Sequence, residues 1–220
     1  MAWRRVAAIT PALALIAWAM LTAASTARID GELAPIAAKL ADPKATAYDW
    51  PALRGRLEGM GPAGLSNPAT HEFLGVAAVR GDPSPESLAK AVSHFSDALR
   101  LRPVSGYTWA NLAAAKYLLG DAGMLFEQAL LTAAELAPNE PAVQGLVAHF
   151  GLAVLDEVRP ATRAAIERVL RAAMRRNPLE TLHIAARRGR LDLACGHLMA
   201  VARKADPKWS GICQSSEARQ

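Results

Sequence analysis

Few side chains in this sequence could bind a metal or act as catalytic groups. The candidates are the five histidines and two cysteines: His71, His94, His149, His183, His197, Cys195 and Cys213. Zinc peptidases place two histidines four residues apart, and many structural zinc sites use Cys-x-x-Cys pairs. Neither pattern occurs here. Cys195 and His197 are two residues apart on a predicted helix and so point in different directions. We therefore expect structural or solvated histidines, with no metal site and no cofactor.

Two motifs of covalent and nucleotide chemistry are also missing. The chain has no Gly-x-Ser-x-Gly nucleophile motif and no P-loop. Asp156 and Glu157 are adjacent, whereas a general acid and base must face each other across a substrate. We expect a protein that is not an enzyme.

Cys195 and Cys213 have the spacing of a local disulfide. Cys195 falls on the apolar stripe of the last predicted helix, and Cys213 follows the break at Asp206-Pro207. A tail that turns at this proline can lie back along the helix, and an oxidising compartment would favour the bond. The alternative is a buried, unreactive Cys195 with a free thiol at Cys213.

Positive charge is concentrated near the C-terminus. Residues 159–220 contain thirteen basic and five acidic side chains, while the whole chain has a net charge of +5. A basic patch is expected from Arg163, Arg168, Arg171, Arg175, Arg176, Arg187, Arg188 and Arg190. Such a patch attracts phospholipid headgroups or acidic glycans; the alternative is a solvated helix face. Nucleic acid is not an expected partner, because the basic region has no interleaved aromatic residues.

Residues 1–28 have the features of a targeting segment. Arg4 and Arg5 precede an uncharged stretch over residues 6–25, about the 20 residues that cross a bilayer core. Small residues around Ser25 also permit cleavage. The prediction is an inner-membrane signal anchor with one transmembrane helix and a periplasmic domain, or a periplasmic protein after signal cleavage.

The remaining sequence predicts an all-α fold. Residues 29–82 are rich in Pro and Gly and predict two short helices, at 31–41 and 51–59. Residues 83–207 alternate amphipathic stretches with short breakers, and residues 208–220 form a tail. Leu88, Val92, Phe95 and Leu99, for example, recur on one helix face. No stretch alternates with the period of a strand.

The breakers recur with the period of a helical repeat. Pro103, Pro138 and Pro178 are 35 and 40 residues apart, close to the 34-residue tetratricopeptide period. The string YTWANLAAAKYLLGD…FEQALLTAAELAPNEP (107–141) resembles a tetratricopeptide repeat (TPR). Its matching positions are Trp109, Leu112, Gly120, Ala133 and Pro138. Gly120 is expected in the tight turn between the two helices of the repeat, because it has no Cβ atom. The resemblance implies a TPR-like superhelix of stacked antiparallel helix pairs, in which Trp109, Leu112, Phe126, Leu130, Phe95 and Leu99 are buried.

A narrower resemblance involves the string ALRLRPVSGYTWANLAAAKYLLG, followed by EPAVQ, Gly151-Leu152 and RRGRLDLAC. These segments are similar to the VpsP-type accessory proteins of bacterial polysaccharide biosynthesis, over about residues 88–195. The resemblance implies an exported protein of an exopolysaccharide assembly system. It carries no catalytic residues.

The TPR-like register also predicts a binding groove, lined by the first helix of each pair. It places Tyr107, Asn111, Ala114 and Tyr117 toward the groove. The Asn111 amide has a donor and an acceptor, which match the backbone of an extended peptide; the alternative is a bond to a neighbouring helix. Two functions follow. The first is a membrane-targeted adaptor that binds protein partners of an envelope polysaccharide system, and the second is a direct binder of acidic glycan or anionic lipid.

Overall fold

The computed structural model describes residues 20, 23–24, 26–38, 49–201 and 211–213. Within these ranges the protein is all-helical and contains no strand, which confirms the predicted fold class. An N-terminal helix over residues 26–38 precedes the labelled elements. The elements are α2 (Trp50–Glu58), α3 (Gly61–Leu65), α4 (Pro68–Gly81), α5 (Pro85–Leu101), α6 (Gly106–Leu118), α7 (Met124–Leu136), α8 (Pro141–Gly151), the 3₁₀ turn η1 (Leu152–Val154), α9 (Pro160–Arg176), α10 (Pro178–Arg187) and α11 (Leu191–Val201).

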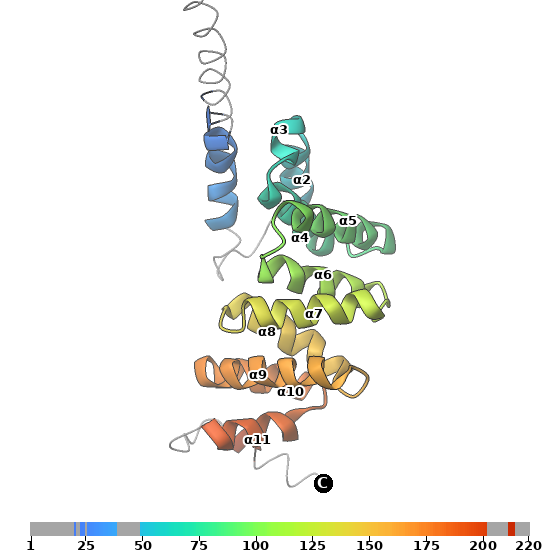
Figure 1. Cartoon of the computed structure of the whole chain (residues 1–220), viewed down its shortest axis with the longest axis vertical. Coiled ribbons are helices and arrows are strands. Elements are labelled where there is room, and N and C mark those ends of the chain that lie inside the picture. Colours follow the sequence, from blue (N-terminus) through green and yellow to red (C-terminus); the bar gives the residue numbers. More distant parts are fainter. Residues whose placement is uncertain (1–19, 21–22, 25, 39–48, 202–210, 214–220) are drawn as a thin grey trace, which may run out of the picture.

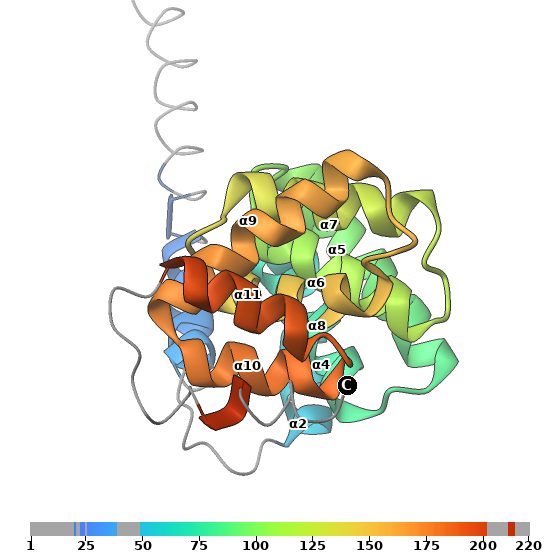
Figure 2. The same ribbon diagram turned by 90° about the horizontal axis from the view of Figure 1, so that it is seen from below.

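Helices α4 to α11 form a stack in chain order (Figure 1). Each helix packs against the next one, and most also pack against the helix two places further on, as α6 does with α8 and α7 with α9. Seen along the stack, α5, α7 and α9 therefore lie on one side and α4, α8 and α10 on the other (Figure 2). We call α4, α6, α8 and α10 the first-helix layer, and α5, α7, α9 and α11 the second-helix layer.

Local sequence fixes where the helices begin. Proline is the first residue of α4, α5, α8, α9 and α10, a position that needs no backbone N–H. The side chains of Ser84, Ser105 and Asn177 accept hydrogen bonds from backbone N–H groups in the first turns of α5, α6 and α10. These caps satisfy donors that would otherwise lack partners. Of the three prolines that gave the sequence period, Pro178 begins a helix, whereas Pro103 and Pro138 lie in the turns after α5 and α7.

Helices within a pair approach closely at small residues. A Cβ atom added to Gly75 on α4 would lie 2.5 Å from the ring of Phe95 on α5, so the glycine makes room for a fully buried phenylalanine. Gly120 has a φ of +75° in the turn between α6 and α7, a conformation that favours glycine. That turn is the one that the sequence assigned to Gly120.

The predicted core is present with one exception. Phe95, Leu99, Leu112, Phe126 and Leu130 are all buried, as expected. Trp109 is only half-buried, which corrects the prediction. Its Nε1 donates to the carbonyl oxygen of Pro103 at 2.8 Å, so the indole lies beside the loop before α6 instead of between the helices.

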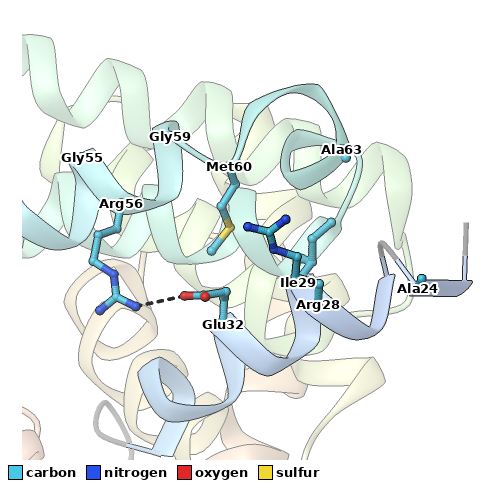
Figure 3. Close-up of a pocket in the computed structure, with 9 residues that line it drawn as sticks. All are labelled: Ala24, Arg28, Ile29, Glu32, Gly55, Arg56, Gly59, Met60 and Ala63. Carbon is cyan, nitrogen blue, oxygen red and sulfur yellow. Dashed lines mark hydrogen bonds and ion pairs between the residues drawn. The ribbon is translucent and has the colours of Figure 1, made fainter. Parts of the chain in front are cut away.

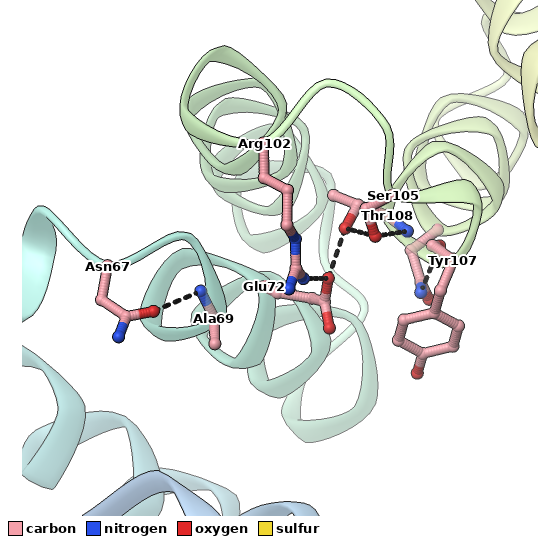
Figure 4. A network of polar contacts seen from close by, with 8 residues as sticks. Asn67, Ala69, Glu72, Arg102, Ser105, Tyr107 and Thr108 are labelled. Carbon is pink, nitrogen blue, oxygen red and sulfur yellow. Dashed lines mark hydrogen bonds and ion pairs between the residues drawn. The ribbon is translucent and has the colours of Figure 1, made fainter. Parts of the chain in front are cut away.

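Two carboxylates tie helices that are two places apart. Glu72 of α4 accepts hydrogen bonds from Arg102 at 3.1 Å and from Thr108 in the first turn of α6 (Figure 4). Glu127 of α7 accepts from Thr162 at 2.7 Å, in the first turn of α9, and from the Arg159 backbone and side chain at 2.9 Å.

At Glu127 the surrounding hydrogen bonds favour the ionised carboxylate. Burial disfavours the charged form of Glu127, but the hydrogen bonds from Thr162 and Arg159 outweigh it, so the pKa of Glu127 is lowered. Both carboxylates also meet the positive end of a helix dipole. A carboxylate that accepts hydrogen bonds from the first turn of the helix two places further on therefore occurs once in each layer.

The N-terminal helices form a second hydrophobic cluster. Leu33 and Ile36 of the N-terminal helix pack with Leu53 and Leu57 of α2 and with Leu74 of α4. The predicted helix at 51–59 corresponds closely to α2, whereas the one predicted at 31–41 lies over residues 26–38 in the described range. Helix α3 was not predicted, because Gly61-Pro62 reads as a turn.

No helix in the described ranges combines the length and apolar character needed to cross a bilayer. The signal segment predicted over residues 1–28 lies largely outside those ranges, since only residues 20, 23–24 and 26–28 of it are described.

At the other end of the stack, Cys195 and Cys213 form a disulfide, with their Cα atoms 5.7 Å apart. Ile212 and Cys213 pack against the main core. The short helical segment 211–213 is thus held to α11 by a covalent bond.

Candidate protein-binding surface

The first-helix layer carries a small hollow between α8 and α10. It encloses about 80 Å³. Its walls are Pro141, Gln144, Gly145, Ala148, Ala173, Arg176, Asn177, Glu180, Thr181 and Ile184. Ala148, Ala173 and Ile184 give it apolar walls, and Gln144 and Thr181 add buried polar side chains. The exposed Arg176 and Glu180 place opposite charges at its edge. At Gly145 an added Cβ atom would meet nothing within 4 Å, so the backbone of α8 is open to an incoming chain.

The predicted groove residues divide into accessible and buried positions. Tyr107, Asn111 and Tyr117 are half-buried, whereas Ala114 is only 4% exposed and forms no part of a surface. The prediction for Ala114 is therefore wrong. Helix α6 contacts α4, α5, α7 and α8, so little of its circumference is left open.

Asn111 already has a hydrogen bond within its own helix. Its Nδ2 donates to the backbone oxygen of Tyr107 at 2.9 Å. This bond fits the structural alternative better than the peptide-binding one. Burial raises the pKa of Tyr107, so its hydroxyl stays protonated and can donate at physiological pH.

Tyr117 belongs to a cluster that joins three helices of the layer. Its ring lies 5.3 Å from the ring of Phe150 on α8, and Arg188 after α10 lies over it at 5.9 Å. Arg188 also contacts His149 Nε2, and His149 meets Phe150 edge to ring at 4.9 Å. We call Tyr117, His149, Phe150 and Arg188 the aromatic–arginine cluster.

Electrostatics keep His149 neutral in this cluster. Burial, followed by the charges of Arg188 and Arg187, lowers the pKa of His149. A neutral ring can accept the Arg188 hydrogen bond at Nε2. No sequence pattern predicted the aromatic–arginine cluster, because Tyr117, the pair His149 and Phe150, and Arg188 lie far apart in the chain. Only the arrangement of the helices brings them together.

The predicted basic patch is divided over several faces. Arg163, Arg171 and Arg190 form ion pairs with Asp156 or Glu167. Arg176 donates to the Asn139 carbonyl oxygen at 3.4 Å, and Arg188 belongs to the aromatic–arginine cluster. Only three of the eight, all exposed, make no polar contact with described residues: Arg168, Arg175 and Arg187. The free positive charge is therefore smaller than the composition suggests.

A larger cleft than this hollow lies elsewhere, between the N-terminal helix and α2–α3. It encloses about 770 Å³ and contains the Arg56–Glu32 ion pair at 3.1 Å (Figure 3). The string Gly59 to Gly64 beside it has the Gly-x-Gly-x-x-Gly spacing, but it joins two helices. The dinucleotide fingerprint requires a strand before the glycines, so this cleft is no nucleotide site of that type.

Comparison with protein-family models, with curated proteins and with solved structures gave no match for this chain.

Proposed function

We propose that this protein is a TPR-like, non-enzymatic adaptor that binds protein partners on its first-helix layer. The observation that carries the proposal is the alternation of the helices. Because α4 contacts α6, α6 contacts α8 and α8 contacts α10, the outward side chains of these helices follow one another along the stack. Repeat proteins of this architecture use such extended strips for binding.

The chemistry of the strip suits a peptide segment. The hollow between α8 and α10 offers apolar walls with a charged rim, and the aromatic–arginine cluster next to it offers rings and a guanidinium. Aromatic and arginine side chains dominate the energetics of protein interfaces. The expected occupant is an extended or helical segment of another protein with apolar side chains and an acidic group.

The proposed setting is the bacterial cell envelope. The Cys195–Cys213 disulfide suits an oxidising compartment such as the periplasm, and residues 1–28 have the composition of a signal anchor or signal peptide. Together with the resemblance to VpsP-type proteins, these features support a role among partners of an exopolysaccharide biosynthesis and export system. The protein would be held at the inner membrane or released into the periplasm.

Site-specific photo-crosslinking in the native cells tests this proposal. A photoreactive amino acid replaces Gly145, which opens onto the hollow, and as a matched control it replaces exposed Gln128 on α7 in the second-helix layer. We expect a discrete adduct with an envelope protein from position 145 alone. Equal adducts from both positions, or none from position 145, would contradict it.

A second candidate function rests on the three unpaired arginines. Arg168, Arg175 and Arg187 are exposed and could bind an acidic polysaccharide or anionic lipid directly. Affinity for such a polymer should fall steeply with added salt. Binding that survives salt but is lost on filling the hollow with Gly145→Trp favours the adaptor. Binding that is lost with salt and in Arg168→Gln/Arg175→Gln favours the polymer binder.

A further inference from the structure

Three potential metal ligands meet between α4 and α5, away from the proposed binding surface. His71 lies on α4, and His94 and Asp97 lie one turn apart on α5. The Nδ1 atoms of the two histidines are 3.3 Å apart, and Asp97 Oδ2 is 3.9 Å from His71 Nδ1. One ligand atom from each residue lies within 4.8 Å of the others. The sequence predicted no metal site because it has neither a pair of histidines four residues apart nor a Cys-x-x-Cys motif.

The hydrogen bonds around His71 orient its free nitrogen toward this group. Its Nε2 lies 2.8 Å from the carbonyl oxygen of Leu65, which can only accept a hydrogen bond. Nε2 therefore carries the proton, and the neutral ring presents the Nδ1 lone pair to His94 and Asp97. A carbonyl that fixes the tautomer of a histidine ligand is a regular feature of metal sites.

The spacing of the two nitrogens fits a tetrahedral ion. With Zn–N bonds of about 2.0–2.1 Å, two nitrogens on a tetrahedral zinc ion lie roughly 3.3–3.4 Å apart, which matches the 3.3 Å observed. Asp97 Oδ1 is held by Arg100, so Oδ2 is the oxygen left to turn toward the ion. To reach the same spacing from His71 Nδ1, Oδ2 must move about half an ångström closer than its present 3.9 Å.

We propose that His71, His94 and Asp97 bind a divalent transition metal ion of the zinc class. Two imidazoles and one carboxylate suit Zn²⁺ or Co²⁺, whereas Mg²⁺ and Ca²⁺ prefer sets made only of oxygen. The side chains of His71 and Asp97 are 11% and 28% exposed, so solvent can reach the fourth position. The bound ion would join α4 to α5 beside the contact between Gly75 and Phe95.

Metal titration of the full chain tests the assignment. The protein carries a purification tag without histidine, is stripped with chelator, and is titrated with Zn²⁺ by calorimetry and with Co²⁺ by visible absorption. The variants are His94→Gln and Asp97→Asn, and the matched control is His183→Gln, an exposed histidine on α10. Circular dichroism of the metal-free proteins verifies that each variant folds.

We expect one equivalent of Zn²⁺, absorption bands of tetrahedral Co²⁺, and no response to Mg²⁺. Either ligand substitution should weaken binding by more than about tenfold, while the His183 variant binds like the unaltered protein. Absence of Zn²⁺ binding by the unaltered protein would overturn the assignment, as would equal affinity in folded His94→Gln and Asp97→Asn. The close histidines would then be a hydrogen-bonded pair that packs α4 against α5.

Discussion

The two ends of the helix stack are covered in different ways. At the N-terminal end, residues 26–38, α2 and α3 cover α4 with a separate apolar cluster. At the C-terminal end, the segment 211–213 lies on the core next to α11 and is held by a disulfide. A stack of repeats needs both ends covered because its terminal helices have no further neighbour. At the N-terminal end the cover is an apolar cluster with no disulfide among the described residues. At the C-terminal end the described cover is the segment 211–213, and a disulfide holds it.

The largest expected effect comes from breaking the apolar cover. Leu57→Ala removes a fully buried side chain from the second cluster, which should cost about 2–5 kcal/mol of unfolding free energy. Urea denaturation followed by circular dichroism measures this loss. The control is Leu65→Ala, because Leu65 is 40% exposed in the same region. If the two variants lose similar free energy, the second cluster is not what holds this end.

The covalent cover should matter somewhat less and more locally. Replacing both Cys195 and Cys213 by Ala should cost roughly 3 kcal/mol, from the 18-residue separation and the chain-entropy estimate. Because each helix contacts only near neighbours, hydrogen exchange should accelerate in α11 and α10 but not in α4 and α5. Uniform acceleration through the stack would show that the two ends are coupled.

The interior tie at Glu127 should give a smaller effect that depends on pH. Glu127→Gln should cost about 1.5–3 kcal/mol at neutral pH, the range for hydrogen bonds to a charged group. The folded-state pKa of Glu127 lies below its ordinary value of 4.5. The stabilisation is therefore complete above that value and is lost as pH falls through the folded-state pKa. Urea unfolding of both proteins from pH 7 to pH 3 should show their difference shrinking, and a constant difference would contradict this account.

The smallest effect is expected from the exposed ion pair at the N-terminal cover. Glu32 and Arg56 are 51% and 59% exposed, and such pairs contribute about 0–1 kcal/mol. Glu32→Gln should therefore change the unfolding midpoint little, and less still in high salt. A loss comparable to that of Leu57→Ala would mean that polar contacts, not the apolar cluster, cover this end.

The sequence correctly predicted the features that depend on a local residue pattern. Phe95 and Leu99 were assigned to the core by helical spacing, and Gly120 to a turn by the absence of a Cβ atom. Each of these assignments needs only a few neighbouring residues, which explains its success.

The errors come from packing between distant elements. Ala114 was placed in a groove because the register of α6 gives only its angle, not the four helices around it. His71 and His94 are 23 residues apart on an antiparallel pair, and Tyr117 meets Arg188 only because α6 and α10 belong to one layer. The spacing of residues along the chain does not predict contacts between side chains that are distant in the sequence. The predictions of the groove and of its partner remain to be tested by the experiments above.

The alternation of the layers also imposes a parity rule on the chain. A segment of two helices can be added or removed from the stack while every later helix keeps its side, so apolar faces continue to meet apolar faces. Adding or removing a single helix would move every later helix to the opposite side and turn its buried stripe outward. Length variation in proteins of this architecture should therefore proceed by pairs of helices.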